Sequence, residues 1–310
     1  MEKFDIIIIG AGPAGMTSAL NCLRAGKTVL VLEGESFGGQ IAFSPRVENF
    51  PTYPKISGAE LMDKLYEQIV EWGARVELEC AQKIAKTDEG FTVTTDYGTY
   101  ECISIILATG VKPRHIGVER EEELIGSGVS YCALCDGAFY SGEDVAVIGD
   151  ANTAIQYAIL LSGYCKHVHV CALFGKLFAD KALIDVLNSR DNVSVQYHLS
   201  LKEFIADDEL KGLRFENTET HEQVIIDCKG AFVCIGQLPN NKAFEELVEL
   251  DKTGYIVADE TCMTSCEGIF AAGDCRTKHI RQLVTASSDG AIAAFNACKY
   301  VDTLKALKAI

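Results

Sequence analysis

Residues 4–33 contain the feature that most constrains the fold. An apolar run at 4–9 leads into a glycine turn at 10–15, a helix is expected over 16–25, and a second apolar run at 28–32 ends at Glu33. Continuous apolar runs are typical of parallel strands that are buried on both faces. A glycine turn between a strand and a helix, with an acid after the second strand, is the dinucleotide-binding fingerprint. The chain is therefore predicted to be an α/β protein with a Rossmann-like nucleotide-binding domain.

Each residue type in this turn has a physical reason. Gly10 permits the tight turn, Gly12 lets the backbone approach a pyrophosphate, and Gly15 allows the helix to pack closely on the strand. Glu33 can accept hydrogen bonds from a ribose. A parallel strand–helix–strand unit without a ligand is the alternative. The candidate contacts in the turn are Gly10, Gly12, Pro13, Ala14 and Gly15.

The same design occurs a second time in the middle of the chain. An apolar strand at 144–148 leads into Gly149-Asp-Ala-Asn-Thr-Ala154, followed by an expected helix at 154–162 and a strand at 167–173. This repeat predicts two related nucleotide-binding folds. Near the end, an apolar strand leads to Asp274, which would contact the same nucleotide if the segment rejoins the first domain. The alternative for Asp274 is a cap of a turn or helix.

The remaining segments predict further elements. Apolar spacing indicates an amphipathic helix at 61–72. Short strands at 74–79, 91–95 and 99–102 have the pattern of a small antiparallel insertion, separate from the buried strand at 104–108. A C-terminal helix is expected at 285–299.

Cys132 and Cys135 are separated by two residues and followed by Asp136. This spacing is typical of a redox dithiol, because one thiolate can attack a disulfide while the other resolves the product. Half of a zinc site and two incidental cysteines are the alternatives. The other close pair, Cys262 and Cys266, has three intervening residues and fits a second zinc pair poorly. No metal is therefore expected.

Composition narrows the class of protein. The formal net charge of −16 argues against binding nucleic acid or an anionic membrane surface. No run approaches the roughly 20 apolar residues of a membrane span, and the first apolar run is too short and too acidic at its start for a signal peptide. The 13 cysteines lie mostly in apolar strands and are expected to be reduced, which predicts a cytoplasmic protein.

Taken together, these motifs make the chain resemble the low-molecular-weight thioredoxin reductases over nearly its whole length. The resemblance implies an FAD-dependent homodimer of two three-layer ββα domains: a discontinuous FAD domain at 1–113 and 242–310, and a dithiol domain at 114–241. It also implies that Cys132 attacks the disulfide of thioredoxin, Cys135 makes the charge-transfer contact with the flavin, and Asp136 is the acid/base. Beyond the first turn and Glu33, the implied FAD contacts are Gly39, Gln40, Asn49, Thr109, Gly110, Asp274, Arg281 and Gln282.

The chain departs from that family where NADPH would bind. Ala151 stands at the second glycine position of the central turn, so a methyl group occupies the space of the pyrophosphate, and Asp150 adds negative charge. The family carries an arginine cluster for the 2′-phosphate after the next strand, whereas residues 171–178 contain no arginine. The pattern resembles the ferredoxin-dependent flavin thioredoxin reductases, so reduced ferredoxin is the expected donor.

Two other functions remain open. The chain could be an ordinary NADPH-dependent enzyme with a divergent loop, or a non-catalytic FAD-binding redox sensor. The overall negative charge disfavours an acidic ferredoxin unless a local basic patch receives it. Two clusters could form such a patch, although FAD phosphate contacts or a solvated face are the alternatives; they are Arg276, Lys278, His279 and Arg281, and Lys112, Arg114 and His115.

Overall fold

The protein is described by a computed structural model that covers residues 1–44 and 46–308. The chain forms two compact units, one built from residues 1–112 and from 238 onward, the other from 113–237. The chain crosses between them through β7 (Val111–Pro113) and β16 (Gln237–Pro239), which pair with each other. Within the described ranges, no helix has the length and apolar character needed to cross a bilayer.

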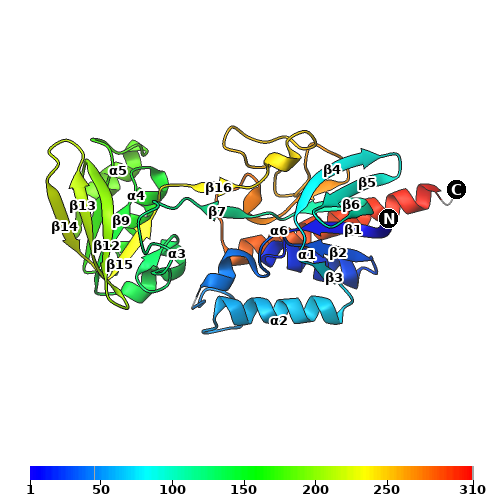
Figure 1. The fold of residues 1–310 in the computed structure, drawn as a ribbon, viewed down its shortest axis with the longest axis horizontal. Helices are drawn as coiled ribbons and strands as arrows, with labels where there is room; N and C mark the ends of the chain where they lie inside the picture. The colour runs from blue at the N-terminus through cyan, green and yellow to red at the C-terminus, as the bar shows by residue number, and fades with distance from the viewer. Residues whose placement is uncertain (45, 309–310) are drawn as a thin grey trace. The chain divides into compact units, whose positions relative to one another are not determined.

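The discontinuous unit is built on one seven-stranded sheet (Figure 1). Its parallel part has the order β3-β2-β1-β6, and β17 pairs with the second half of β6. The antiparallel hairpin of β4 and β5 pairs with the first half of β6. The bounds are β1 (Glu2–Ile9), β2 (Val29–Leu32), β3 (Arg75–Glu77), β4 (Ala81–Thr87), β5 (Gly90–Thr95), β6 (Thr99–Leu107) and β17 (Ile269–Ala271).

Two predictions for this sheet were wrong in detail. β6 is one strand rather than two, and β3 pairs in parallel with β2 instead of joining the antiparallel hairpin. The burial of β6 explains the first error. Its first half alternates between buried and partly exposed residues, as an outer hairpin does, while its last four residues are all buried. One strand therefore carries two patterns that looked like separate elements.

Three helices, α1 (Pro13–Arg24), α2 (Gly58–Glu71) and α6 (Leu283–Lys308), pack against one face of this sheet. The opposite face packs against η3 (Lys242–Phe244) and the chain around residues 248–258. The helix expected at 61–72 begins earlier because Ser57 caps it, its hydroxyl accepting from the Glu60 amide at 3.2 Å. α6 extends the helix expected at 285–299 in both directions.

The continuous unit has three layers. A five-stranded parallel sheet, β11-β10-β9-β15-β8, is covered by a three-stranded antiparallel sheet on one face and by α4 and α5 on the other. The predicted α/β class with Rossmann-like parallel sheets is confirmed. The bounds are β8 (Val129–Ser130), α3 (Ala133–Asp136), η2 (Gly137–Tyr140), β9 (Asp144–Ile148), α4 (Asn152–Leu161), β10 (His167–Cys171), α5 (Lys181–Asn188), β11 (Val193–Gln196), β12 (Leu199–Ala206), β13 (Leu210–Asn217), β14 (Gln223–Asp227) and β15 (Gly230–Val233).

Candidate active site and nucleotide cradle

The cysteine pair lies directly after the carboxyl end of β8. Cys132 caps the short helix α3, and its Sγ accepts a 3.2 Å hydrogen bond from the Cys135 amide. The two cysteines form a disulfide with a Cα–Cα distance of 5.3 Å, and both are partly exposed. A disulfide at the surface end of a strand, held by a single helical turn, can exchange with a disulfide or dithiol of another molecule.

Asp136 ends α3 and lies largely inside the unit. Its Oδ2 accepts a 2.6 Å hydrogen bond from the hydroxyl of Ser130, while Oδ1 is buried without a partner among the described residues. Burial raises the pKa of Asp136 above its ordinary value, and the hydrogen bond from Ser130 opposes this rise. A carboxyl group with a raised pKa beside a disulfide is suited to deliver and receive protons during disulfide exchange.

The glycines of the first turn have separate geometric roles. Gly10 has a φ of +110°, and a Cβ there would lie 2.2 Å from the Ala108 carbonyl oxygen. A Cβ on Gly15 would lie 1.8 Å from the Gly10 carbonyl oxygen. At Gly12, by contrast, nothing lies closer than the Gly39 Cα, at 3.8 Å. Gly10 and Gly15 are needed for packing, whereas Gly12 leaves its face open at the N-terminus of α1, where a phosphate would be favoured.

The acid at the end of β2 is held by backbone amides. Glu33 accepts from the Ala11 amide at 2.8 Å through Oε2 and from the Glu35 amide at 2.9 Å through Oε1. Pro13 and Ala14 form the first residues of α1. The turn and the acid therefore lie at the carboxyl ends of β1 and β2, which is where open parallel sheets bind nucleotides.

Residues far apart in sequence meet around this turn. The Asn49 side-chain amide donates to Gln282 at 3.2 Å, and the Gln40 amide donates to the Val111 carbonyl. Thr109, which precedes Gly110, donates at 2.7 Å to Asn241. Asn241 is fully buried and also donates to the Gly254 and Cys275 carbonyls, each at 2.9 Å. Asn241 could not be predicted from the sequence, because its partners come from distant segments.

Asp274 follows β17 in η4 (Gly273–Cys275), at the edge of the same sheet. Its Oδ1 is buried and has no hydrogen-bond partner among the described residues. Burial raises the pKa of Asp274 to about 6, against the opposing charges of Lys278 and Arg281. A buried carboxylate oxygen without a partner is costly unless another group donates to it, so this oxygen is suited to a ligand hydroxyl.

A buried charge network supports the η4 turn. Arg276 is 1% exposed and donates to both oxygens of Asp289 at 2.9 and 2.8 Å, and Lys278 adds a third contact at 2.9 Å. Asp289 also accepts from the Gly273 amide at 3.0 Å. These contacts lower the pKa of Asp289 despite its burial. Asp289, on α6, thereby ties the turn that carries Asp274 to the helix.

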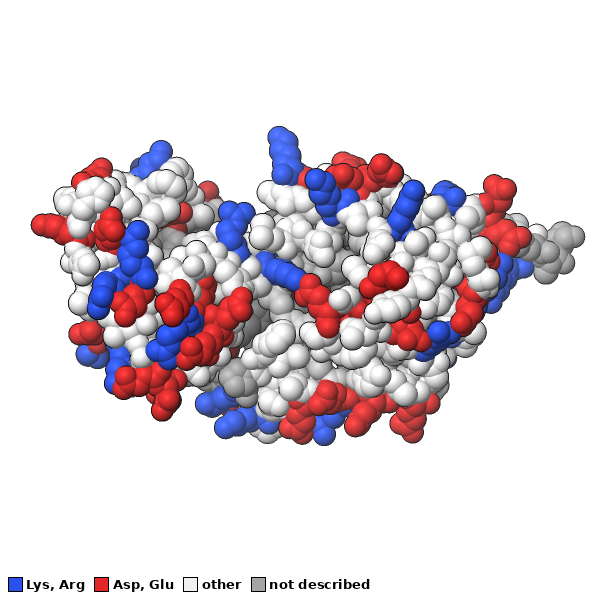
Figure 2. All heavy atoms as spheres, in the orientation of Figure 1, with Lys and Arg blue, Asp and Glu red and all other residues white. Residues whose placement is uncertain are grey.

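This network bears on one of the two candidate basic patches. Arg276 and Lys278 belong to a cluster that could form such a patch, but their charges are buried and neutralised by Asp289. Arg281 lies over the Tyr255 ring at 4.2 Å and donates to the Asp274 carbonyl at 3.3 Å. On the face drawn in Figure 2, basic and acidic side chains are interspersed. Arg276 and Lys278 therefore contribute no free positive charge to a docking surface.

The second glycine turn is tied to the segment after β10. Gly149, with φ of +149°, leads through Asp150 and Ala151 into α4. The Phe178 amide donates to the Asp150 carbonyl at 2.7 Å, and Ala151 forms an isolated parallel bridge with Phe178. Asn152 exchanges two further hydrogen bonds with Asp180, at 3.1 and 2.8 Å. The segment after β10 thus engages the Asp150 carbonyl and the Asn152 side chain, while the N-terminus of α4 carries no side-chain cap.

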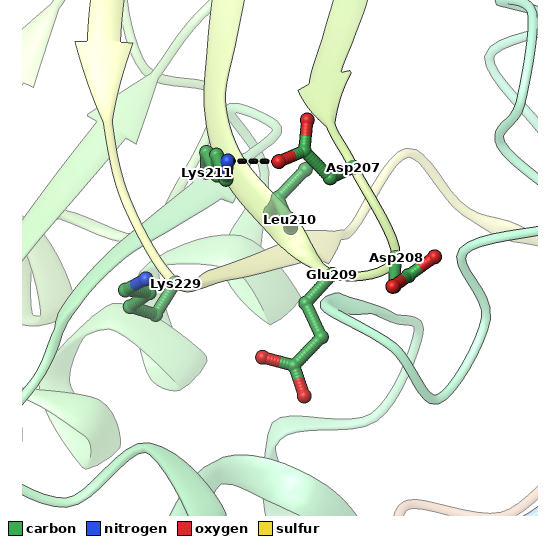
Figure 3. A pocket seen from close by; sticks show the side chains of 6 residues that line it. All are labelled: Asp207, Asp208, Glu209, Leu210, Lys211 and Lys229. Atoms are coloured by element: carbon green, nitrogen blue, oxygen red, sulfur yellow. Dashed lines mark hydrogen bonds and ion pairs between the residues drawn. The ribbon is translucent and has the colours of Figure 1, made fainter.

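A surface pocket of about 310 Å³ lies elsewhere in the continuous unit, at the turn between β12 and β13 (Figure 3). Three acids and two lysines line it, and Lys211 is paired with Asp207. None of the residues selected from the sequence lines this pocket. It contains no group that performs redox chemistry, so no site is assigned to it. Its lining is Asp207, Asp208, Glu209, Leu210, Lys211 and Lys229.

Known proteins share both the motifs and the fold. Residues 4–290 match the family model of the pyridine nucleotide-disulphide oxidoreductases. The thioredoxin reductase of Treponema pallidum is 38% identical over 303 residues, covering 97% of this chain and 98% of that protein. NADPH-dependent thioredoxin reductase 3 of Arabidopsis thaliana is 38% identical over 307 residues, covering 96% of this chain and 58% of that protein. The crystal structure of thioredoxin reductase from Streptococcus pyogenes has a TM-score of 0.93 and 36% identity, covering 97% of this chain and 99% of that one.

The chain therefore belongs to the pyridine nucleotide-disulphide oxidoreductase family, as an FAD-binding flavoprotein of the thioredoxin reductase type. Its residues fit FAD on two observations. Gly12 presents an open face at an uncapped helix N-terminus, and Asp274 has a buried oxygen that lacks a donor. When bound, FAD supplies the redox chemistry that links an electron donor to the disulfide.

Proposed function

We propose that the chain reduces thioredoxin through its Cys132–Cys135 dithiol, with electrons from reduced ferredoxin. The Cys132 thiolate attacks a sulfur of the thioredoxin disulfide, forming a mixed disulfide and releasing one thioredoxin thiolate. The Cys135 thiolate then attacks the Cys132 sulfur and releases the second, and the thioredoxin thiolates take up two protons. Asp136 relays protons in this exchange. Reducing the enzyme disulfide again takes two electrons, supplied by two ferredoxins in single-electron transfers.

FAD is assigned to the discontinuous unit, 1–113 with 242–310, and the dithiol to the central segment, 114–241. The pyrophosphate of FAD is assigned to the turn at Gly12. Glu33 is assigned to a hydrogen bond with the ribose, and Asp274 to a hydrogen bond with the ribityl chain. The other proposed contacts are Gly10, Pro13, Ala14, Gly15, Gly39, Gln40, Asn49, Thr109, Gly110, Arg281 and Gln282. We also propose a homodimer, as the resemblance implies.

The observation that carries the choice of donor is the residue composition of the second turn and of the segment after β10, which are also hydrogen-bonded to each other. The Asp150 carbonyl and Asn152, at the start of α4, are engaged by Phe178 and Asp180. Ala151 adds a methyl group where a pyrophosphate would need close backbone approach. The segment also replaces a phosphate-binding arginine cluster with Leu173, Phe174 and Phe178, all exposed. A one-electron donor needs no such site, because it requires only close approach to the flavin.

An NADPH-dependent enzyme is the second candidate. It is favoured by the Arabidopsis relative, whose name states NADPH dependence and which is 38% identical to this chain. A non-catalytic FAD-binding sensor is the candidate from another class. Catalytic turnover of thioredoxin disulfide by small amounts of the protein would exclude the sensor.

One experiment distinguishes the two donors. The oxidised FAD-loaded protein is mixed anaerobically with NADPH, NADH or reduced ferredoxin while the flavin absorbance is followed. We expect rapid bleaching by ferredoxin and none by micromolar nucleotide, with thioredoxin reduced only in the ferredoxin reaction. Rapid bleaching by micromolar NADPH that supports catalytic thioredoxin reduction would overturn the proposed donor.

A further inference from the structure

One hydroxyl group connects the two functional elements of the dithiol loop. Ser130, the last residue of β8, is 4% exposed. Its Oγ donates to Asp136 Oδ2 at 2.6 Å and accepts from the Cys132 amide at 3.0 Å. A serine hydroxyl has one proton and two lone pairs, so it can make both contacts at once. The contact to Asp136 is the short one expected for a hydroxyl that donates to a carboxylate.

We propose that Ser130 is a positioning residue of the disulfide chemistry: its hydroxyl fixes the Asp136 carboxylate relative to Cys132 and stabilises its charged form. This inference deepens the proposed function and rests on the assignment of Asp136 as the acid/base. Ser130 touches neither substrate nor disulfide sulfur in its described contacts. It acts through the groups on either side of it.

The surroundings of Asp136 make this one hydrogen bond decisive. In the reduced protein the Cys132 and Cys135 thiols of the same loop titrate beside Asp136. Tyr140 from η2 and Tyr157 from α4 also interact with Asp136, and burial raises the pKa of each of these tyrosines to about 12. Both are therefore neutral at physiological pH. No cationic side chain is recorded as acting on Asp136, and its Oδ1 has no partner among the described residues. Ser130 is thus the donor that offsets the desolvation of this carboxylate.

Loss of the hydroxyl should therefore raise the pKa of Asp136 further. A hydrogen bond to a charged group corresponds to a shift of about 1 to 2 pH units. The reduced protein reports this shift through the alkylation rate of its dithiol by iodoacetamide, measured against pH. This readout requires neither thioredoxin nor an electron donor. The inflection due to Asp136 is defined as the one that disappears in Asp136→Asn.

The variants separate a positioning role from simple loss of packing. In Ser130→Ala and Ser130→Gly we expect the inflection to move about 1 to 2 units to higher pH. Ser130→Thr keeps a hydroxyl and should restore the wild-type position. Ser104→Ala is the matched control, because Ser104 is also buried and donates at 2.9 Å to the Gly268 carbonyl in the other unit. In an Asp136→Asn background, removing the hydroxyl should have no further effect on the profile.

Folded Ser130→Ala and Ser130→Gly proteins with an unshifted inflection would overturn the proposal. So would an equal shift in Ser104→Ala, or a shift that persists in the Asp136→Asn background. A failure of the proposed function would give a different result from a failure of this proposal. If the inflection moves as expected but the wild-type protein does not reduce thioredoxin, the role of Ser130 stands and the assigned substrate is wrong.

Discussion

The amide nitrogen of Phe178 donates a 2.7 Å hydrogen bond to the carbonyl oxygen of Asp150. This contact joins the segment after β10 to the turn that begins α4. In a nucleotide-binding fold, that turn and that segment hold the pyrophosphate and the 2′-phosphate. In this chain they hold each other. The fold of a pyridine-nucleotide domain is retained, while the Asp150 carbonyl and the Asn152 side chain at this turn are engaged by the segment after β10.

Restoring the second glycine alone should not restore nucleotide use. In Ala151→Gly the methyl group is removed, but the arginines are still absent and the tie to Phe178 remains. Two or three missing charge-assisted contacts weaken NADPH binding by about 3 to 8 kcal/mol, roughly two to six powers of ten. Flavin bleaching by NADPH in this variant should match the wild-type baseline, and reduced ferredoxin serves as the positive control. Strong bleaching would mean that Ala151 is the main obstacle.

Removing either sulfur should abolish turnover without removing the cofactor. Cys132→Ser and Cys135→Ser should each lose thioredoxin reduction, because exchange needs both an attacking and a resolving thiolate. The flavin spectrum and FAD content should be retained, since the first turn lies in the other unit. Only one of the two variants should show a charge-transfer band. Near-normal turnover in either variant would contradict the assignment.

Valine substitutions at two glycines of the first turn should impair the protein in different ways, one in cofactor binding and the other in folding. Gly12→Val should give folded but colourless protein, because the position has free space and an ordinary φ of −82°, yet its face is where the pyrophosphate lies. Gly15→Val should fail to fold, since its Cβ would meet the Gly10 carbonyl at 1.8 Å. Circular dichroism and the extracted chromophore distinguish the two. FMN in the extract of the wild-type protein would refute the assignment of FAD.

The apoprotein should lose stability as pH rises through the range set by Asp274. Burial raises the pKa of Asp274 from 3.8 to about 6, so between these values the folded state holds a proton that the unfolded state has released. The free energy of unfolding should therefore fall by up to about 3 kcal/mol between roughly pH 4 and pH 6. Urea titrations of the apoprotein measure this slope. Asp274→Asn should flatten it, and a slope equal to wild type would exclude Asp274 as its source.

The buried network on α6 should be sensitive to the loss of one member. Arg276→Met removes the bidentate partner of Asp289, and breaking a buried ion pair in this way costs about 3–5 kcal/mol. Lys3→Met is the matched control, because the Lys3–Glu89 pair is exposed and its loss should be too small to resolve in denaturant. Asp289→Asn should also weaken FAD retention, because Asp289 holds the Gly273 amide. If Lys3→Met and Arg276→Met lowered the free energy of unfolding equally, the stabilising role of the buried network would be refuted.

The parts of the fold and site that were predictable lie within short stretches of chain. The strand–turn–helix units, the cysteine spacing and the packing of Gly10 and Gly15 all follow from residues next to one another. The sequence pattern predicted two strands in place of β6 because the two halves of β6 have different neighbours. The hairpin pairs with the first half, and β17 pairs with the second half. Neither neighbour can be read from the strand itself.

The parts that could not be predicted depend on residues brought together from distant segments. Asn241 meets Thr109 across 132 positions, and Asp289 neutralises Arg276 from a different element. A dense run of basic residues left a surface patch open as one interpretation, and the burial of Arg276 and Lys278 against Asp289 could not be read from the sequence. The role proposed for Ser130 was also not predictable, because a serine before a cysteine pair forms no distinctive sequence pattern.

The burial of the other cysteines has a practical consequence for chemical labelling. Of the 11 cysteines outside the disulfide, nine are buried, Cys266 is partly exposed and only Cys80 is exposed. Desolvation raises the pKa of Cys102 and Cys228 to about 12, so these thiols remain protonated and unreactive at neutral pH. A probe or crosslinker aimed at the reduced dithiol therefore has few competing targets in the native protein. Substituting Cys80 alone would remove the most accessible of them, without the need for a cysteine-free background.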